Sequence, residues 1–157
     1  MLLGEAMCQL IEEPQYAVEP LYAAAYRGDE HAIQQLARLG ADPNIPHMES
    51  GYSALHVAVF RYKLSAVTEL LRCFRGQLRL DLQDLKGDTA LHMAARSGYL
   101  DICSAICDEH SCDPLAHPNN RGQFPSEICR SHKIYQVIQV CQKRNELARE
   151  LEQLRMM

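Results

Sequence analysis

The sequence predicts an all-α solenoid in which short helix pairs, joined by hairpin-like loops, stack side by side. Three observations lead to this prediction. Similar segments recur at nearly constant spacing, the repeats carry paired apolar residues at helical spacing, and the last stretch of the chain is rich in helix formers without Gly or Pro. Helix pairs of this size are too thin to bury their apolar faces alone, so neighbouring repeats must stack.

The repeat is clearest around two Leu-His pairs. Leu55 and Leu91 lie 36 residues apart, Leu21 precedes Leu55 by 34 residues, and Ser126 follows Leu91 by 35. This spacing divides the chain into about four repeats. Their approximate bounds are residues 18–50, 51–86, 87–121 and 122–142, the last of which is degenerate.

Each repeat is expected to contain two helices. Ser53 and Thr89 are suitable N-caps, and Gly28 and Gly98 stand where the first helix ends. Tyr62 occupies the corresponding position of the second repeat, so we expect a distorted turn there. The apolar residues predicted for the second helices are Ile33, Leu36, Val67, Leu70, Leu71, Ile102, Cys103, Ile106 and Cys107.

The two ends of the chain are predicted to be helical. Apolar residues of 1–14 fall on one helical face, which predicts a capping helix over the first repeat. A membrane-surface helix is the rival interpretation, but the segment lacks the basic face that such helices favour. Two interpretations of residues 134–157 stay open. One is a long terminal helix that caps the stack. The other is the start of a coiled coil, which the seven-residue spacing of Val140, Leu147 and Leu154 indicates.

These motifs resemble the ankyrin-repeat family. Thr89–Gly98 follows the pattern T-P-L-H-x-A-A-x-x-G except at Ala90, and Gly40–Asn44 follows G-A-D-x-N. The resemblance implies an ankyrin-repeat solenoid covering residues 18–142, in which His56 and His92 tie hairpin to helix by hydrogen bonds. Residues 80–92 are also similar, more weakly, to repeat junctions of the inhibitor-of-κB group, whose members mask Rel-type transcription factors.

The resemblance also implies a partner-binding surface on the concave face, made of hairpin tips and the ends of the first helices. We hypothesise that Arg27, Arg61 and Arg96 form a ladder that binds an acidic or phosphorylated segment. The alternative is that these arginines pair with local carboxylates such as Asp88. The register assigns twelve residues to this surface, namely Tyr26, Arg27, Tyr52, Phe60, Arg61, Leu85, Lys86, Asp88, Arg96, Ser97, Arg121 and Gln123.

No catalytic or cofactor motif stands out in the sequence. There is no phosphate-binding loop, and no local signature surrounds a Cys/His pair, so we expect no enzyme activity and no cofactor. The cysteine and histidine residues between 103 and 132 superficially resemble a zinc site. The register instead places Cys103 and Cys107 in the core and Cys112 where the family has Ala, which favours packing over metal binding.

Composition narrows the partners and the location. A net charge of -4 disfavours nucleic acid as a direct ligand, and no apolar run is long enough to span a membrane. Seven cysteines without an export signal favour reduced thiols, in the cytoplasm or nucleus. Three functions stay open: an adaptor or scaffold, as a monomer or coiled-coil homodimer; a stoichiometric inhibitor of a signalling or transcription factor; and an enzyme or metal protein using the Cys/His cluster.

Overall fold

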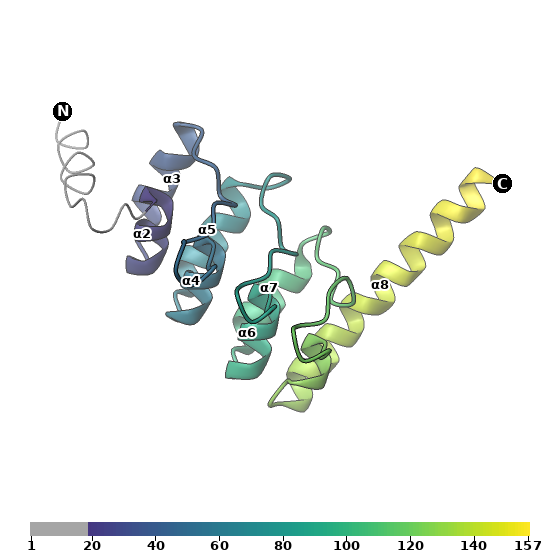
Figure 1. Ribbon diagram of the computed structural model, residues 1–157. Helices are drawn as coiled ribbons and strands as arrows, with labels where there is room; N and C mark the ends of the chain where they lie inside the picture. Colours follow the sequence, from purple (N-terminus) through teal and green to yellow (C-terminus); the bar gives the residue numbers. More distant parts are fainter. Residues whose placement is uncertain (1–18) are drawn as a thin grey trace. The chain divides into compact units, whose positions relative to one another are not determined.

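The structure is a computed structural model that describes residues 19–157, so the capping helix expected over residues 1–14 lies outside the described residues. The described residues form α-helices and one short 3-10 helix, with no β-strand among them (Figure 1). They divide into a first unit that ends at Leu78 and a second unit that begins at Arg79. None of the helices in residues 19–157 is long and apolar enough to cross a membrane.

The first unit contains two helix pairs. Helix α2 (Pro20–Arg27) pairs with α3 (Glu30–Arg38), and α4 (Ala54–Phe60) pairs with α5 (Leu64–Cys73). The pairs stack in register, because α2 packs against α4 and α3 packs against α5. The apolar residues predicted for the second helices of this unit are all buried, namely Ile33, Leu36, Val67, Leu70 and Leu71.

The second unit contains one regular pair and one altered pair. Helix α6 (Ala90–Ser97) pairs with α7 (Leu100–Asp108), which buries Ile102, Cys103, Ile106 and Cys107 as predicted. In the fourth repeat the first helix is reduced to the 3-10 helix η1 (Pro125–Glu127), and the second is α8 (His132–Met156). Helix α8 packs against α7 and η1 and then continues past them (Figure 1). The second helix of the degenerate repeat and the long terminal helix are therefore one element, which begins two residues before the expected boundary at 134.

The helix starts follow the sequence prediction. The side chains of Ser53 and Thr89 each accept a hydrogen bond from the backbone N–H of the histidine three residues later, His56 or His92. In return, the ring of that histidine accepts a hydrogen bond from the backbone N–H of the capping residue. The backbone nitrogen of Ser53 lies 3.3 Å from Nδ1 of His56, and that of Thr89 lies 3.1 Å from Nδ1 of His92. This reciprocal arrangement satisfies two backbone donors that a helix start otherwise leaves unpaired.

The turn at Tyr62 keeps the geometry of a glycine turn. Tyr62 has φ +51°, close to the left-handed values of Gly28 and Gly98 at the matching positions. The closing hydrogen bonds also match, since Tyr62 N donates to Val59 O at 2.9 Å as Gly28 N donates to Ala25 O at 3.2 Å. The expected distortion is therefore absent, and the strain falls on the backbone of one tyrosine instead.

The irregular exit from the second repeat is held by two buried side chains. Phe74 and Leu78 are both buried, and Leu78 N donates to Phe74 O at 2.9 Å. The Asn44 side chain, from the closing motif of the first repeat, donates to Gln77 O at 2.8 Å. The segment lacks the family's closing pattern, yet it is fixed by apolar burial and by the preceding repeat.

Candidate functional site

Two hairpin tips of the second unit share one hydrogen-bond pattern. In the tip of residues 84–88, Asp84 Oδ1 accepts from Lys86 N at 2.8 Å and from Asp88 N at 2.9 Å. In the tip of residues 119–123, Asn119 Oδ1 accepts from Arg121 N at 2.9 Å and from Gln123 N at 3.0 Å. A short polar side chain that satisfies its own turn is the reason Asp and Asn favour such positions. Each tip is thereby fixed in shape.

The two tips are joined to each other. Asn120 N donates to Lys86 O at 3.0 Å, and the Asn120 side chain donates to Leu85 O at 3.1 Å. Gln83 Nε2 donates to Gly87 O at 2.7 Å and to Pro118 O at 2.9 Å, which adds a second link. The side chains carried by the tips are therefore presented on a rigid backbone.

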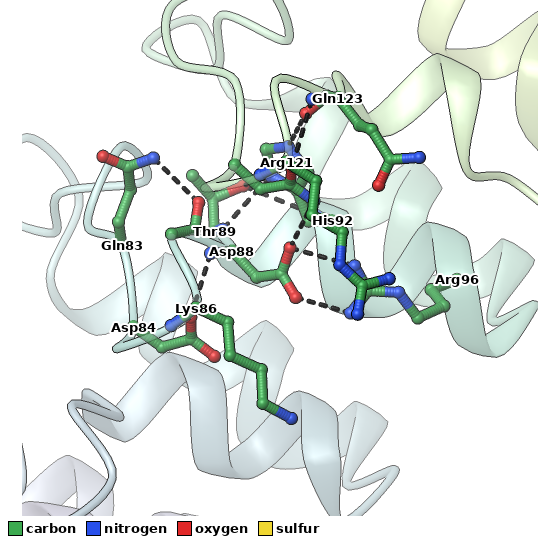
Figure 2. Close-up of polar contacts among 11 residues, drawn as sticks. Gln83, Asp84, Lys86, Asp88, Thr89, His92, Arg96, Arg121 and Gln123 are labelled. Atoms are coloured by element: carbon green, nitrogen blue, oxygen red, sulfur yellow. Dashed lines mark hydrogen bonds and ion pairs between the residues drawn. The ribbon is translucent and has the colours of Figure 1, made fainter.

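Asp88 lies beneath the tips and holds Arg96. Its side chain is 2% exposed and forms a two-pronged ion pair with Arg96, in which Arg96 Nη2 lies 3.0 Å from Asp88 Oδ1 (Figure 2). Asn119 Nδ2 donates to the same oxygen at 3.0 Å. Burial opposes ionisation, but the hydrogen bonds from Arg96 and Asn119 outweigh it, so the pKa of Asp88 lies below its usual range. Asp88 was expected on the partner-binding surface, yet it is a buried residue that orients Arg96.

His92 links the start of α6 to the neighbouring tip. One ring nitrogen, Nε2, lies 2.9 Å from Gln123 O, and the other accepts from Thr89 N (Figure 2). Because a carbonyl can only accept, Nε2 carries the proton and the ring is neutral. Burial lowers the pKa of His92. The tie between hairpin and helix that the family resemblance implied is therefore present.

These contacts shape an open groove in the second unit, which we call the tip groove. It has a volume of about 490 Å³, and its lining includes Lys86, Arg96 and Arg121. Arg96 keeps 42% of its side chain exposed although it is paired, while Lys86 and Arg121 are exposed and Leu85 is 67% exposed. Asp88 compensates only one of the three basic side chains. The other residues that line the tip groove are Leu85, Asp88, Asn119 and Asn120.

The predicted residues of the first unit include two contacts of aromatic rings. Tyr52 lies against Phe60 with ring centroids 5.8 Å apart, and the Arg61 guanidinium stacks over the Tyr26 ring at 4.6 Å. Tyr26, Phe60 and Arg61 are exposed, as is Arg27. Aromatic and arginine side chains with exposed faces are frequent at the centres of protein interfaces.

The arginines of the predicted ladder have different surroundings. Arg96 has the local carboxylate partner that the alternative interpretation foresaw, whereas Arg61 contacts an aromatic ring. Ser97 is exposed at the end of α6, and Gln123 is half-buried with its carbonyl engaged by His92. The ladder as a binding element stays a prediction.

The cysteines show a grouping that sequence reasoning missed. Cys107 and Cys112 lie together with Cys141 of α8, whereas Cys103 and Cys129 are not part of this group. A signal for Cys141 exists in the sequence, since Ile134, Ile138 and Cys141 follow the spacing of one buried helix face. That spacing shows burial but not which other cysteines are near.

The stacked helix pairs and the hydrogen-bonded hairpin tips define a helical repeat module. The chain belongs to the ankyrin-repeat family, because the family model described as "Ankyrin repeats (3 copies)" matches residues 6–123. It resembles the crystal structure of the ankyrin repeat domain of Bcl-3, described as a unique member of the IkappaB protein family. The TM-score is 0.69 at 27% identity, and the match covers 76% of this chain and 50% of that one.

Two curated relatives match over shorter stretches. Over 77 residues, 49% of the chain, it is 39% identical to the putative palmitoyltransferase ZDHHC13 of Danio rerio, of which 11% is covered. Over 90 residues, 57% of the chain, it is 39% identical to the ankyrin repeat domain-containing protein SAT10 of Stachybotrys chartarum, of which 4% is covered. The chain thus spans a small part of these relatives' length. Ankyrin repeats are protein–protein interaction modules, and this chain carries such a module.

Proposed function

We propose that the chain is a non-catalytic adaptor or scaffold that binds a partner protein, with the tip groove receiving an acidic or phosphorylated segment of that partner. The observation that carries the proposal is the arrangement of Arg96, held by buried Asp88, beside the exposed cations of Lys86 and Arg121. A guanidinium already fixed in place loses little side-chain entropy when it meets a carboxylate or phosphate.

The charge balance of the tip groove supports an anionic ligand. Asp88 neutralises Arg96, which leaves the charges of Lys86 and Arg121 uncompensated within the groove lining. The chain as a whole has a net charge of -4, so this local excess of positive charge differs from the rest of the molecule. Complementary charge of this kind steers encounter and selects partners more than it adds affinity.

The buried histidine supports a non-catalytic role. His92 is fully buried, and both of its ring nitrogens are engaged, by Gln123 O and by Thr89 N. A general base must reach the proton that it abstracts, and this imidazole cannot. The exposed side chains of the tip groove are suited to binding.

Charge reversal in the tip groove tests the proposal. The double variant Lys86→Glu/Arg121→Glu is compared with Lys143→Glu/Arg155→Glu, which makes the same charge change on exposed positions of α8. Binding of a library of acidic and phosphorylated peptides is measured by fluorescence polarisation, and partners are captured from cell lysate. We expect the groove variant to lose at least about tenfold in affinity, about 1.4 kcal/mol, and the α8 variant to behave as wild type. Equal binding by both variants, or a library without any ligand, would contradict an acidic ligand in this groove.

A second candidate is a stoichiometric inhibitor of a signalling or transcription factor. The similarity to the Bcl-3 ankyrin domain favours it, together with the Leu80–His92 segment that resembles inhibitor-of-κB junctions. Titration of the purified chain against Rel-homology dimers, followed by light scattering, tests it. A one-to-one complex that blocks DNA binding by the Rel-homology dimer would support inhibition. If no complex forms, the inhibitor function is contradicted and the adaptor function remains.

The same proposal places the chain in the cytoplasm or nucleus. The six cysteines among residues 19–157 are free thiols, which these compartments keep reduced. Imaging of a fluorescently tagged full-length protein checks the location, and secretion of the tagged protein would contradict it.

A further inference from the structure

Three cysteines of the second unit meet at one point. Cys107 lies near the end of α7, Cys112 lies in the loop that follows, and Cys141 lies on α8. Their sulfur atoms all lie within 4.8 Å of one another, and each residue is at most 4% exposed. Among residues 19–157 no other cluster of three metal-ligating side chains is found.

The surroundings of the cluster differ from those of a purely apolar core. Arg144 Nη2 lies 3.4 Å from Cys141 Sγ and also donates to Glu109 O at 3.1 Å. Asn145 Nδ2 donates to Cys112 O at 2.7 Å, which fixes the loop against α8. A guanidinium beside a buried sulfur favours the thiolate form, and the thiolate is the form that binds metal.

We propose that Cys107, Cys112 and Cys141 form a binding site for one Cu(I) ion. Within residues 19–157 no histidine or carboxylate joins this group as a fourth ligand. Three soft sulfur donors suit Cu(I), whereas structural Zn²⁺ almost always takes four ligands. A planar site with metal–sulfur bonds of about 2.3 Å would set the sulfurs about 4.0 Å apart, within the limit of 4.8 Å that the three sulfurs meet. The ion would cross-link α8 to the third repeat.

A route from solvent to the cluster exists. Cys107 and Cys141 line a groove of about 480 Å³ between α7 and α8, whose rim includes Lys133 and Arg144. This groove is the path by which the ion would reach the cluster, and its binding would displace protons from the thiols.

Binding of Cu(I) to the full chain tests the site. The reduced protein is titrated without oxygen against a colorimetric Cu(I) chelator of known affinity, and X-ray absorption counts the sulfur neighbours. We expect one ion per chain with three sulfur neighbours. Because only the folded state holds the three sulfurs together, the ion should bind it more tightly than the unfolded chain, and we also expect the thermal unfolding midpoint to rise.

Cys112→Ala is the sharpest variant, because the closing motif of the first repeat has Ala41 at the same position and the fold should tolerate it. It should bind Cu(I) at least about 100-fold more weakly, as should Cys141→Ala, and neither should gain thermal stability from copper. Cys73→Ala and Cys103→Ala are the controls and should bind as wild type. Absence of stoichiometric Cu(I), unchanged binding by Cys112→Ala, or preferential binding of Zn²⁺ would overturn the proposal.

Discussion

Two buried residues of the second unit hold their exposed neighbours in place. Asp88 fixes Arg96, and His92 fixes the backbone at Gln123, although both side chains are buried. Burying such groups is costly unless every polar atom is paired. Both meet this condition, since Asp88 has Arg96 and Asn119 as donors and His92 uses both ring nitrogens. The positions of exposed side chains therefore depend on buried ones.

The lowered pKa of His92 predicts a loss of stability in mild acid. The folded chain binds a proton at His92 less readily than the unfolded chain, in which the pKa of His is about 6.5. The free energy of unfolding therefore falls as the pH drops from about 6.5 toward the pKa of His92 in the folded state. We expect His92→Gln to be less stable than wild type at pH 7.5 but to lose less between pH 7.5 and 5.5. Urea unfolding at both pH values measures this. Equal losses in the two proteins would show that His92 does not set the acid sensitivity.

Among the elements, the tips need glycine for different reasons. Gly87 and Gly122 have φ +75° and +74°, which strains any residue with a Cβ. At Gly122 a Cβ would meet nothing within 4 Å, whereas at Gly87 it would lie 2.6 Å from the backbone nitrogen of Asn120. Gly87 therefore allows the two tips to approach, in addition to completing a turn.

Alanine at the two glycines separates these effects. Gly122→Ala should cost about 1–2 kcal/mol from the left-handed backbone alone. Gly87→Ala should cost a further 1–3 kcal/mol, roughly, because the new methyl group collides with Asn120. Chemical denaturation of both variants measures the difference. Similar costs at the two positions would mean that the tips move apart readily and that the tip groove is not rigid.

For the molecule as a whole, α8 has two different halves. Its first half buries Ile134, Ile138 and Cys141, whereas four apolar residues from position 140 onward on the same helix are 59–68% exposed. Those four are Val140, Leu147, Leu151 and Leu154. The buried face of the first half thus belongs to the fourth repeat, and the exposed row runs from Val140 into the second half at heptad spacing.

The exposed row is predicted to leave the isolated chain monomeric at micromolar concentration. About two heptads are present, whereas a sustained coiled coil needs three or four. Size-exclusion chromatography with light scattering measures the mass. A dimer that the double variant Leu147→Glu/Leu154→Glu converts to monomer would instead establish the coiled-coil interpretation.

The sequence by itself determined the repeat, the N-caps and the buried faces of the second helices, and the family resemblance added the tie that His92 makes between hairpin and helix. These features depend on residues a few positions apart, whose effect is local and recurs at a fixed period. Such local patterns do not predict every backbone conformation. The position of Tyr62 in the turn was predictable, but the left-handed conformation that its backbone adopts was not.

Only the tertiary structure decided that Asp88 is buried under Arg96, that the tips at residues 84–88 and 119–123 join, and that Cys141 meets Cys107 and Cys112. The tip contacts link different repeats, and the cysteine cluster joins a loop to a helix almost thirty residues further on. The repeat period aligns equivalent positions but does not say which side chains face each other once the pairs stack. The packing of α8 in place of a regular helix pair brings its cysteine to the other two, and no local pattern encodes that packing.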